Sequence, residues 1–164
     1  PRRFGWIDLF AESAIRKHKL LAGMGLEPLG NKFSAAGLED AFKGRSVHVK
    51  NALLNQALIA GIGNIYANEA LFLSGISPRR KAGNITGGRA ERLAIAIVTT
   101  LRTAIEDGGT SLRDHVQPGG EIGYFVQRLA VYGQAGKPCP RCTSLIKTIT
   151  QSGRSSFYCS RCQR

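Results

Sequence analysis

Four cysteines near the C-terminal end constrain the fold of this chain more than any other feature of its sequence. They form two pairs, Cys139-Pro-Arg-Cys142 and Cys159-Ser-Arg-Cys162, separated by sixteen residues, and there is no other cysteine. Two facing pairs of this kind offer four thiolates in the tetrahedral arrangement that structural Zn²⁺ prefers. The spacing therefore predicts one zinc ion bound by all four cysteines. Spacing alone also admits two alternatives, a pair of disulfides and a rubredoxin-like iron site.

The segment between the two pairs indicates why a metal would be needed. Residues 145–150 and 155–158 have the composition of two strands, joined by a turn at 151–154. A lone two-stranded hairpin is only marginally stable in water. Metal ligation would contribute roughly 10–16 kcal/mol, the apparent value for zinc-finger peptides. This arrangement places Arg154 at the hairpin tip, where a side chain can reach a partner.

The charge of the chain indicates a negatively charged partner. The formal net charge is +12, and no Asp or Glu follows Glu121. The basic residues of that acid-free stretch are Arg128, Lys137, Arg141, Lys147, Arg154, Arg161 and Arg164. Such a surface favours nucleic acid over the plainer alternative of a basic face that only meets solvent. The sequence has no apolar run long enough to cross a bilayer and no cationic helix with an aromatic face, which disfavours a membrane partner.

Helical periodicity dominates the rest of the chain and predicts a mainly α fold. Apolar spacing and helix-breaking Gly or Pro residues predict helices over 34–43, 47–56, 64–74 and 89–106. The last and longest carries a stripe of apolar residues at every fourth position, typical of a core-facing helix. The apolar residues at 6–10 favour a strand, but no sheet partner for it is evident in this sequence.

A glycine turn between the second and third predicted helices suggests a phosphate site. Gly61 and Gly63 allow a ligand to approach the backbone closely, and Asn64 is a favourable N-cap for the next helix. The first-turn N–H groups of that helix would point outward at the positive end of its dipole, which suits an anion. Lys50, near the start of the preceding helix, could reach the same phosphate. The plainer alternatives are an ordinary cap for Asn64 and a solvated surface lysine.

Several short motifs extend this pattern along nearly the whole chain. They are PRRFG at 1–5, GIGNIYANE at 61–69, GISP at 75–78, GGTSL at 108–112, VYG at 131–133 and the closing Cys-x-x-Cys-Gln. With these motifs the chain resembles the bacterial formamidopyrimidine-DNA glycosylase family, which excises oxidised purines, chiefly 8-oxoguanine, and then cleaves the strand by β,δ-elimination. The resemblance implies a remnant of an N-terminal β-sandwich at 1–22 and a hinge at 23–31. It implies a helix–two-turn–helix domain at 32–123, with a lesion-recognition loop at 111–123, and a β-hairpin zinc finger at 124–164.

The same resemblance implies that the main catalytic residues lie outside this sequence. The family's nucleophile is an N-terminal proline followed by a glutamate, whereas here Arg2 follows Pro1. Pro1 therefore matches the proline of an internal Asp-Pro-Arg-Arg-Phe-Gly motif instead. We expect the chain to be the C-terminal part of a bifunctional DNA glycosylase and AP lyase, and to lack base excision by itself.

Individual residues take expected roles from this resemblance. Arg2 and Phe4 match the wedge that fills the space left by the flipped base, where Arg pairs with the orphaned cytosine and Phe enters the stack. Lys50 and Asn64 match phosphate ligands. Arg154 matches the zinc-finger arginine that grips phosphates beside the lesion and takes part in δ-elimination.

Two further features bear on specificity. Arg45 lies in a DNA-contact region of the family, although Ser46 stands where a basic residue is common. Residues 113–123 match the loop that closes over flipped 8-oxoguanine, which endonuclease VIII-like enzymes for oxidised pyrimidines generally lack. The alternatives are such an enzyme, or a non-catalytic zinc-ribbon DNA-binding protein. The expected partner is double-stranded DNA with oxidised purines or abasic sites, bound by a monomer in the bacterial cytoplasm, in association with the nucleoid.

Overall fold

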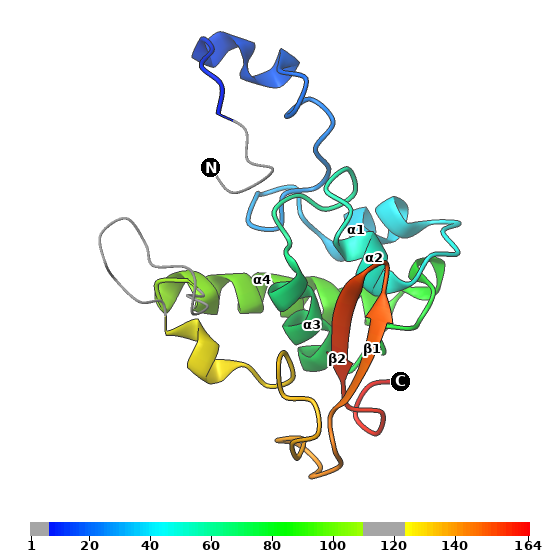
Figure 1. Cartoon of the computed structure of the whole chain (residues 1–164). Helices are drawn as coiled ribbons and strands as arrows, with labels where there is room; N and C mark the ends of the chain where they lie inside the picture. Colours follow the sequence, from blue (N-terminus) through cyan, green and yellow to red (C-terminus); the bar gives the residue numbers. More distant parts are fainter. Residues whose placement is uncertain (1–6, 110–123) are drawn as a thin grey trace.

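The helices and the hairpin follow one another in the order that the sequence predicts. The computed structural model describes residues 7–109 and 124–164. Within them the chain is mainly helical, with a two-stranded antiparallel sheet near its C-terminal end (Figure 1). The elements, with η for a 3-10 helix, are η1 (Glu12–Lys17), α1 (Ala35–Phe42), α2 (Val49–Leu53), α3 (Asn64–Leu73), η2 (Ala82–Asn84), α4 (Gly88–Glu106), η3 (Phe125–Arg128), β1 (Lys147–Gln151) and β2 (Arg154–Tyr158). The predicted fold class, a helical domain followed by a β-hairpin, is confirmed.

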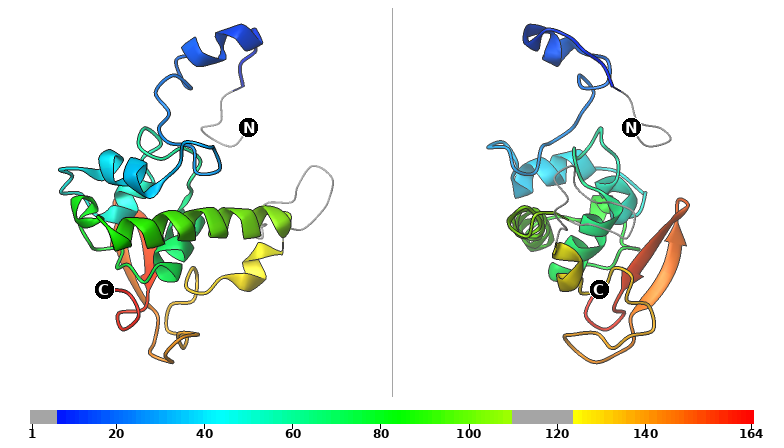
Figure 2. Two further views of the ribbon diagram at one scale, coloured as in Figure 1. Left: turned by 180° about the vertical axis from the view of Figure 1, so that it is seen from behind. Right: turned by 60° about the vertical axis from the view of Figure 1, so that its left-hand side comes forward.

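One apolar core holds the four α-helices together. The Ser34 hydroxyl caps α1 by accepting a hydrogen bond from the Gly37 N–H at 3.1 Å. The fully buried core residues include one leucine from each α-helix: Leu38, Leu53, Leu71 and Leu93. The two views of Figure 2 show that α3 lies between α4 and the hairpin. The outer face of α4 and the hairpin are therefore on opposite sides of the helical domain.

The helices on either side of the glycine turn differ in detail from the prediction. The helix expected over 47–56 is shorter, because α2 ends at Leu53. Asn55 favours the turn that follows, since its side-chain oxygen accepts a hydrogen bond at 3.0 Å from the N–H two residues on. The N-cap of α3 is Gly63 rather than Asn64. As the first helical residue, Asn64 directs its side-chain amide to the hairpin instead of capping the helix.

The hairpin turn is tighter than the sequence suggests. β1 and β2 pair in register along their whole length, with Gln151 opposite Arg154, so that Ser152 and Gly153 alone form the turn. Both turn residues have positive φ, 47° and 73°, as in the type I′ turns that suit strand twist. Arg154 is consequently the first residue of β2 rather than part of the turn, and it is exposed. Leu145, expected in the first strand, lies before β1 and forms a separate bridge.

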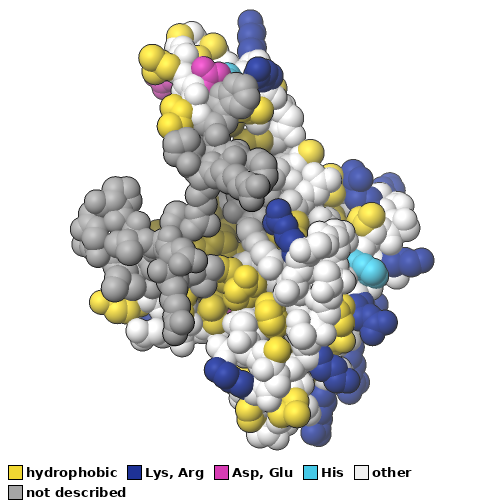
Figure 3. Space-filling view, viewed as in Figure 1, with side chains coloured by type: hydrophobic (Ala, Val, Ile, Leu, Met, Phe, Trp, Pro, Cys, Tyr) yellow, Lys and Arg dark blue, Asp and Glu magenta, His cyan; other side chains and the backbone are white. Residues whose placement is uncertain are grey.

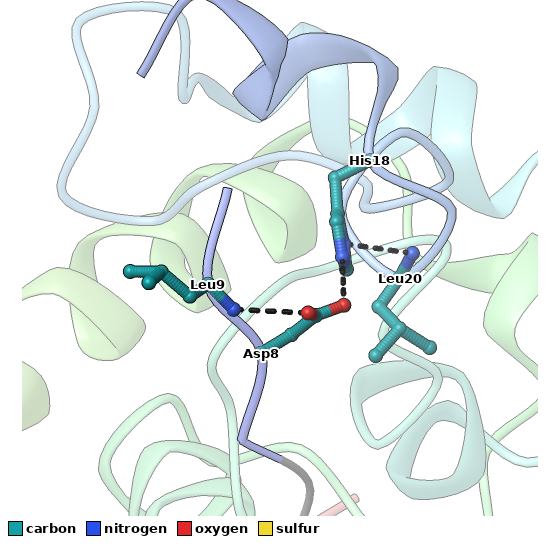
Figure 4. A network of polar contacts seen from close by, with 4 residues as sticks. All are labelled: Asp8, Leu9, His18 and Leu20. Carbon is teal, nitrogen blue, oxygen red and sulfur yellow. Dashed lines mark hydrogen bonds and ion pairs between the residues drawn. The ribbon is translucent and has the colours of Figure 1, made fainter. Parts of the chain in front are cut away.

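The described residues before the predicted hinge contain a short 3-10 helix and no strand. The strand expected over 6–10 is not formed in residues 7–10, because no strand of the described chain lies beside them to pair with. Asp8 Oδ2 instead lies 3.0 Å from His18 Nε2, and His18 Nδ1 accepts a 3.4 Å hydrogen bond from the Leu20 N–H (Figure 4). Polar contacts, rather than strand pairing, therefore join the start of this segment to residues 18–20.

The predicted hinge, 23–31, is tied to the helical domain. Leu26 forms a parallel bridge with Ile59, just before the glycine turn. Gly25 approaches the backbone so closely that a Cβ at this position would collide with the Leu58 carbonyl. The backbone of this segment therefore packs directly against the chain that connects α2 and α3.

Candidate metal centre and nucleic-acid interface

The two cysteine pairs meet at one point at the base of the hairpin. All four Sγ atoms lie within 4.8 Å of one another. Cys142 and Cys159 are 3.4 Å apart, Cys139 and Cys162 are 3.9 Å apart, and all four are free thiols rather than disulfides. Four thiolates at about 2.3 Å from a zinc ion stand about 3.8 Å apart in a tetrahedron. The four cysteines therefore fit one structural zinc ion, as the sequence predicts.

Hydrogen bonding spreads the pKa values of these thiols. Contact with Ser144 lowers the pKa of Cys142 to about 6, whereas hydrogen bonding to Cys142 raises the pKa of Cys162 to about 12. The Arg141 N–H also donates a hydrogen bond to Cys139 Sγ at 3.4 Å. A bound zinc ion would be held by Cys139, Cys142, Cys159 and Cys162 and would keep all four sulfurs as thiolates.

Lys50 lies at the centre of the contact between the helical domain and the hairpin. Its side chain is fully buried, and Nζ donates to the Ser155 carbonyl and to Ser156 Oγ, each at 2.7 Å. Ser156 Oγ in turn donates to Gln151 Oε1 at 2.6 Å. The alternative of a solvated surface lysine is therefore wrong. An ammonium group has three donors, so these two contacts leave one N–H for a further acceptor.

Burial and a neighbouring charge both disfavour protonation of Lys50. Its pKa is lowered from 10.5 to about 8, first by loss of solvation and second by the guanidinium of Arg154. Neither Lys50 nor Arg154 forms an ion pair with a carboxylate of the described residues. Two cations held near each other without a counter-ion form a site that an anion such as phosphate would stabilise.

Asn64 points to the same place from the first turn of α3. Its Nδ2 donates at 3.1 Å to the β2 carbonyl that Lys50 also binds. The turn before it is open, because a Cβ built on Gly61 or Gly63 would meet no described atom within 4 Å beyond its own chain neighbours. Gly61 also has a φ of 79°, a conformation that favours glycine. Three predicted DNA-binding residues, Lys50, Asn64 and Arg154, thus come together beside an open turn.

The other predicted DNA contacts are not part of this cluster. Arg45 is exposed, and its Nε donates at 2.8 Å to the Ala41 carbonyl at the end of α1. No described contact joins it to the cluster beside the hairpin. Arg2, Phe4 and the predicted lesion-recognition loop at 111–123 lie outside the described residues.

Two buried residues of α3 that the sequence analysis did not single out join this helix to the zinc module. Asn68 Oδ1 accepts from the Phe157 N–H at 2.7 Å, and its Nδ2 donates to the Asn64 carbonyl at 2.7 Å. Glu69 accepts three backbone N–H bonds from residues 130–132, at 2.8 to 3.0 Å. Adjacent polar residues in the middle of an otherwise apolar helix are the sequence signal that identifies both.

Basic side chains outnumber acidic ones on one face of the molecule. On the face shown in Figure 3, Lys and Arg side chains gather along the right-hand side, whereas acidic side chains are visible only near the N-terminal segment. The basic edge on this face favours a polyanionic partner there. Separately, no helix in the described ranges combines the length and apolar character needed to cross a membrane.

Two protein-family models match the chain, and together they cover most of it. Residues 24–116 match the formamidopyrimidine-DNA glycosylase H2TH (helix–two-turn–helix) domain. Residues 136–164 match a zinc finger found in FPG and IleRS. The first match includes the Lys50 and Asn64 cluster, and the second includes all four cysteines and Arg154.

Curated relatives are similar to the chain over its whole length. The formamidopyrimidine-DNA glycosylase of Ruegeria sp. (strain TM1040) is 55% identical over 166 residues, which cover 100% of this chain and 59% of that protein. The formamidopyrimidine-DNA glycosylase of Acidiphilium cryptum (strain JF-5) is 51% identical over 169 residues, with 100% and 62% coverage. The chain thus spans about three fifths of the length of the curated relatives it matches.

Solved structures agree with these sequence matches. The MutM (Fpg) protein from Thermus thermophilus superimposes with a TM-score of 0.84 at 41% identity, covering 90% of this chain and 56% of that chain. Lactococcus lactis Fpg in complex with DNA containing an abasic site gives 0.86 at 30% identity, covering 94% and 57%. Motifs, fold, cysteine cage and both family matches lead to one conclusion: the chain belongs to the formamidopyrimidine-DNA glycosylase family.

Proposed function

We propose that this chain is the DNA-binding C-terminal part of a base-excision-repair enzyme. The observation that carries the proposal is the meeting of Lys50, Asn64 and Arg154 beside the open glycine turn. Two of these side chains are cations without a carboxylate partner among the described residues, and the third lies in the first turn of a helix. Phosphate groups of a DNA backbone supply the negative charge that this arrangement lacks.

Each residue of the cluster has a distinct part in the proposed interface. Arg154 is exposed and presents a planar set of donors that suits a phosphate. Asn64 is the first residue of α3, so the positive end of the helix dipole faces the same phosphate backbone. Lys50 donates to the Ser155 carbonyl and to the Ser156 hydroxyl of β2, and in this proposal its third donor binds the phosphate. Zinc bound to the four cysteines would join the two Cys-x-x-Cys segments, here called zinc knuckles, and so fix the hairpin that carries Arg154.

The proposed parent enzyme removes oxidised purines, such as 8-oxoguanine and formamidopyrimidines, and nicks the strand by β,δ-elimination. Structures of the Lactococcus lactis relative contain DNA with an abasic site and DNA with Fapy-dG, which supports this substrate class. In this proposal Arg154 also assists δ-elimination, and Arg45 adds a backbone contact. Arg2 and Phe4 act as the wedge at the flipped base, and residues 111–123 form the lesion-recognition loop. The four segments expected from the sequence, 1–22, 23–31, 32–123 and 124–164, are part of the same proposal.

Binding to a set of matched duplexes tests the function of this chain directly. Zinc-loaded protein is titrated by fluorescence anisotropy against duplexes that contain a tetrahydrofuran abasic analogue, 8-oxoguanine opposite cytosine, an oxidised pyrimidine, or no lesion. We expect affinity for all four that falls steeply with salt. Binding that does not depend on salt would contradict a phosphate-binding interface. Preference for the oxidised pyrimidine over 8-oxoguanine would favour an endonuclease VIII-like relative.

Catalysis is tested separately, by borohydride trapping on the 8-oxoguanine duplex. We expect no covalent adduct, because nucleophilic catalysis by an amine needs an acid and a base positioned around it, and Arg2, Arg3 and Phe4 follow Pro1. An adduct that maps to Pro1 would overturn the match of this proline to an internal motif.

We further propose that the protein acts as a monomer on the nucleoid, in the bacterial cytoplasm. The bacterial origin of the curated relatives and the basic surface support this setting. Light scattering with and without duplex tests the monomer. A stable dimer in both conditions would contradict it.

A further inference from the structure

The first zinc knuckle, residues 139–142, contacts the C-terminal end of α3 through Arg141. The Arg141 guanidinium donates to the Phe72 carbonyl through Nη1 at 2.9 Å and to the Leu73 carbonyl through Nη2 at 3.1 Å. Its Cζ also lies 4.4 Å from the centre of the Phe72 ring. The last carbonyls of a helix lack partners within the helix and carry the negative end of its dipole. A planar cation with several donors satisfies both needs at once.

α3 is attached to the zinc module at three levels along one face. Asn64, Asn68 and Phe72 are four residues apart, so they lie one above another on the same side of the helix. The Asn64 and Asn68 side chains bind the backbone of β2, and Phe72 lies beneath Arg141. The first of these residues belongs to the proposed phosphate site, and the last adjoins the metal centre. The orientation of α3 therefore connects the zinc knuckle to the DNA-binding cluster.

The second knuckle carries an arginine at the equivalent position without these contacts. Arg141 and Arg161 each precede the second cysteine of a Cys-x-Arg-Cys sequence. Arg161 is exposed, and within the described part of the chain it forms no hydrogen bond or ion pair. The contrast shows that the Arg141 contacts do not follow from the knuckle sequence itself.

We propose that Arg141 is a positioning residue for DNA binding. It fixes the C-terminal end of α3 on the zinc knuckle and thereby holds Asn64 and the open glycine turn in the orientation that meets the phosphate backbone. The inference rests on the proposed function, since it assumes that Asn64 binds DNA. It assigns to Arg141 a role in affinity without contact between Arg141 and the nucleic acid.

The test compares Arg141→Ala with Arg161→Ala, which remove the same charge from equivalent positions. Zinc content is measured by metal analysis, helicity by circular dichroism, and affinity by anisotropy on the abasic-analogue duplex. We expect both variants to retain one zinc ion. The affinity of Arg141→Ala for the duplex should be lower than that of Arg161→Ala by a factor of roughly five or more. Arg141→Lys should lie between wild type and Arg141→Ala, because lysine keeps the charge at the helix end but lacks the planar fork that reaches two carbonyls.

A double-mutant cycle with Asn64→Ala separates positioning from a direct DNA contact. If Arg141 acts through α3, its effect should shrink when Asn64 is already removed, whereas the effect of Arg161→Ala should simply add. Equal affinity of zinc-loaded Arg141→Ala and Arg161→Ala, or strict additivity of Arg141→Ala with Asn64→Ala, would overturn the inference. If Arg141→Ala fails to fold, wild-type affinity of Arg141→Lys would overturn it. A wild-type chain without salt-dependent DNA binding would overturn the proposed function itself, and this inference with it.

Discussion

Replacement of Glu69 by Gln tests how α3 holds the segment that leads into the zinc finger. Glu69 is only 8% exposed. Its Oε2 accepts the Ala130 N–H at 2.9 Å, and its Oε1 accepts those of Val131 and Tyr132 at 3.0 and 2.8 Å. Glutamine keeps the shape and one acceptor oxygen, which can still serve Val131 and Tyr132. Its amide group, however, would face the Ala130 N–H as donor against donor.

The expected loss follows from these three bonds. One charge-assisted hydrogen bond is worth about 1.5–3 kcal/mol, and the two remaining bonds weaken when the acceptor loses its charge. We expect Glu69→Gln to lower the free energy of unfolding by about 3 kcal/mol, which corresponds to a fall in Tm of about 6–12 °C for a chain of this size. Glu69→Ala leaves all three N–H groups without this partner and should cost about 5 kcal/mol.

Thermal unfolding followed by circular dichroism measures the effect, with zinc held at one fixed excess because metal binding shifts the apparent stability. Glu91→Gln is the matched control, since Glu91 lies exposed on α4. Its effect should stay within about 0.5 kcal/mol. A Tm of Glu69→Gln within about 2 °C of that control would show that the Glu69 carboxylate does not stabilise the backbone at 130–132.

Three further predictions concern pH, metal and helix capping. A phosphate beside Lys50 favours its charged form and raises its pKa from about 8 on binding, so duplex affinity should be full below pH 8 and fall as the pH rises above that value. A titration of the dissociation constant against pH checks this, and an equal fall in Lys50→Met would contradict the assignment. Excess chelator should release one zinc ion per chain and open the amides of β1 and β2 to hydrogen exchange, whereas retained protection would show that the hairpin is stable without metal. Ser34→Ala should lower the free energy of unfolding by about 1 kcal/mol in urea titrations, and an unchanged midpoint would rule out a capping role for the Ser34 hydroxyl.

The sequence predicts well those elements that depend only on residues close together along the chain. The helix expected over 89–106 is observed as Gly88–Glu106, because a long apolar stripe defines it without help from other segments. The Ser34 cap and the cysteine cage follow in the same way from short spacings. The end of α2 was missed because a single side chain, Asn55, decides between helix and turn.

The sequence predicts which residues belong to the candidate site, but it does not predict their burial or their hydrogen-bond partners. The sequence identifies Lys50 as a basic residue near a helix start, but the strand that buries it lies 105 residues away along the chain. Only the fold shows that its ammonium group is buried and donates to Ser155 and Ser156 of the hairpin. The partners of Glu69 could not be predicted for the same reason, since they are three backbone amides more than sixty residues away. A backbone amide carries no sequence signature, so contacts of this kind require the structure.

We propose that Lys50, Asn64 and Arg154 form a phosphate-binding interface on a hairpin held by zinc. The most direct test is the dependence of duplex affinity on salt for zinc-loaded wild type, Arg154→Ala and the charge-matched control Arg161→Ala. Arg154 is exposed, so its removal should leave the Tm unchanged. We expect the slope of log K against log salt to become shallower by about 0.9 in Arg154→Ala and to stay at the wild-type value in Arg161→Ala. A wild-type slope in Arg154→Ala would contradict the proposed interface, because it would mean that this arginine neutralises no phosphate.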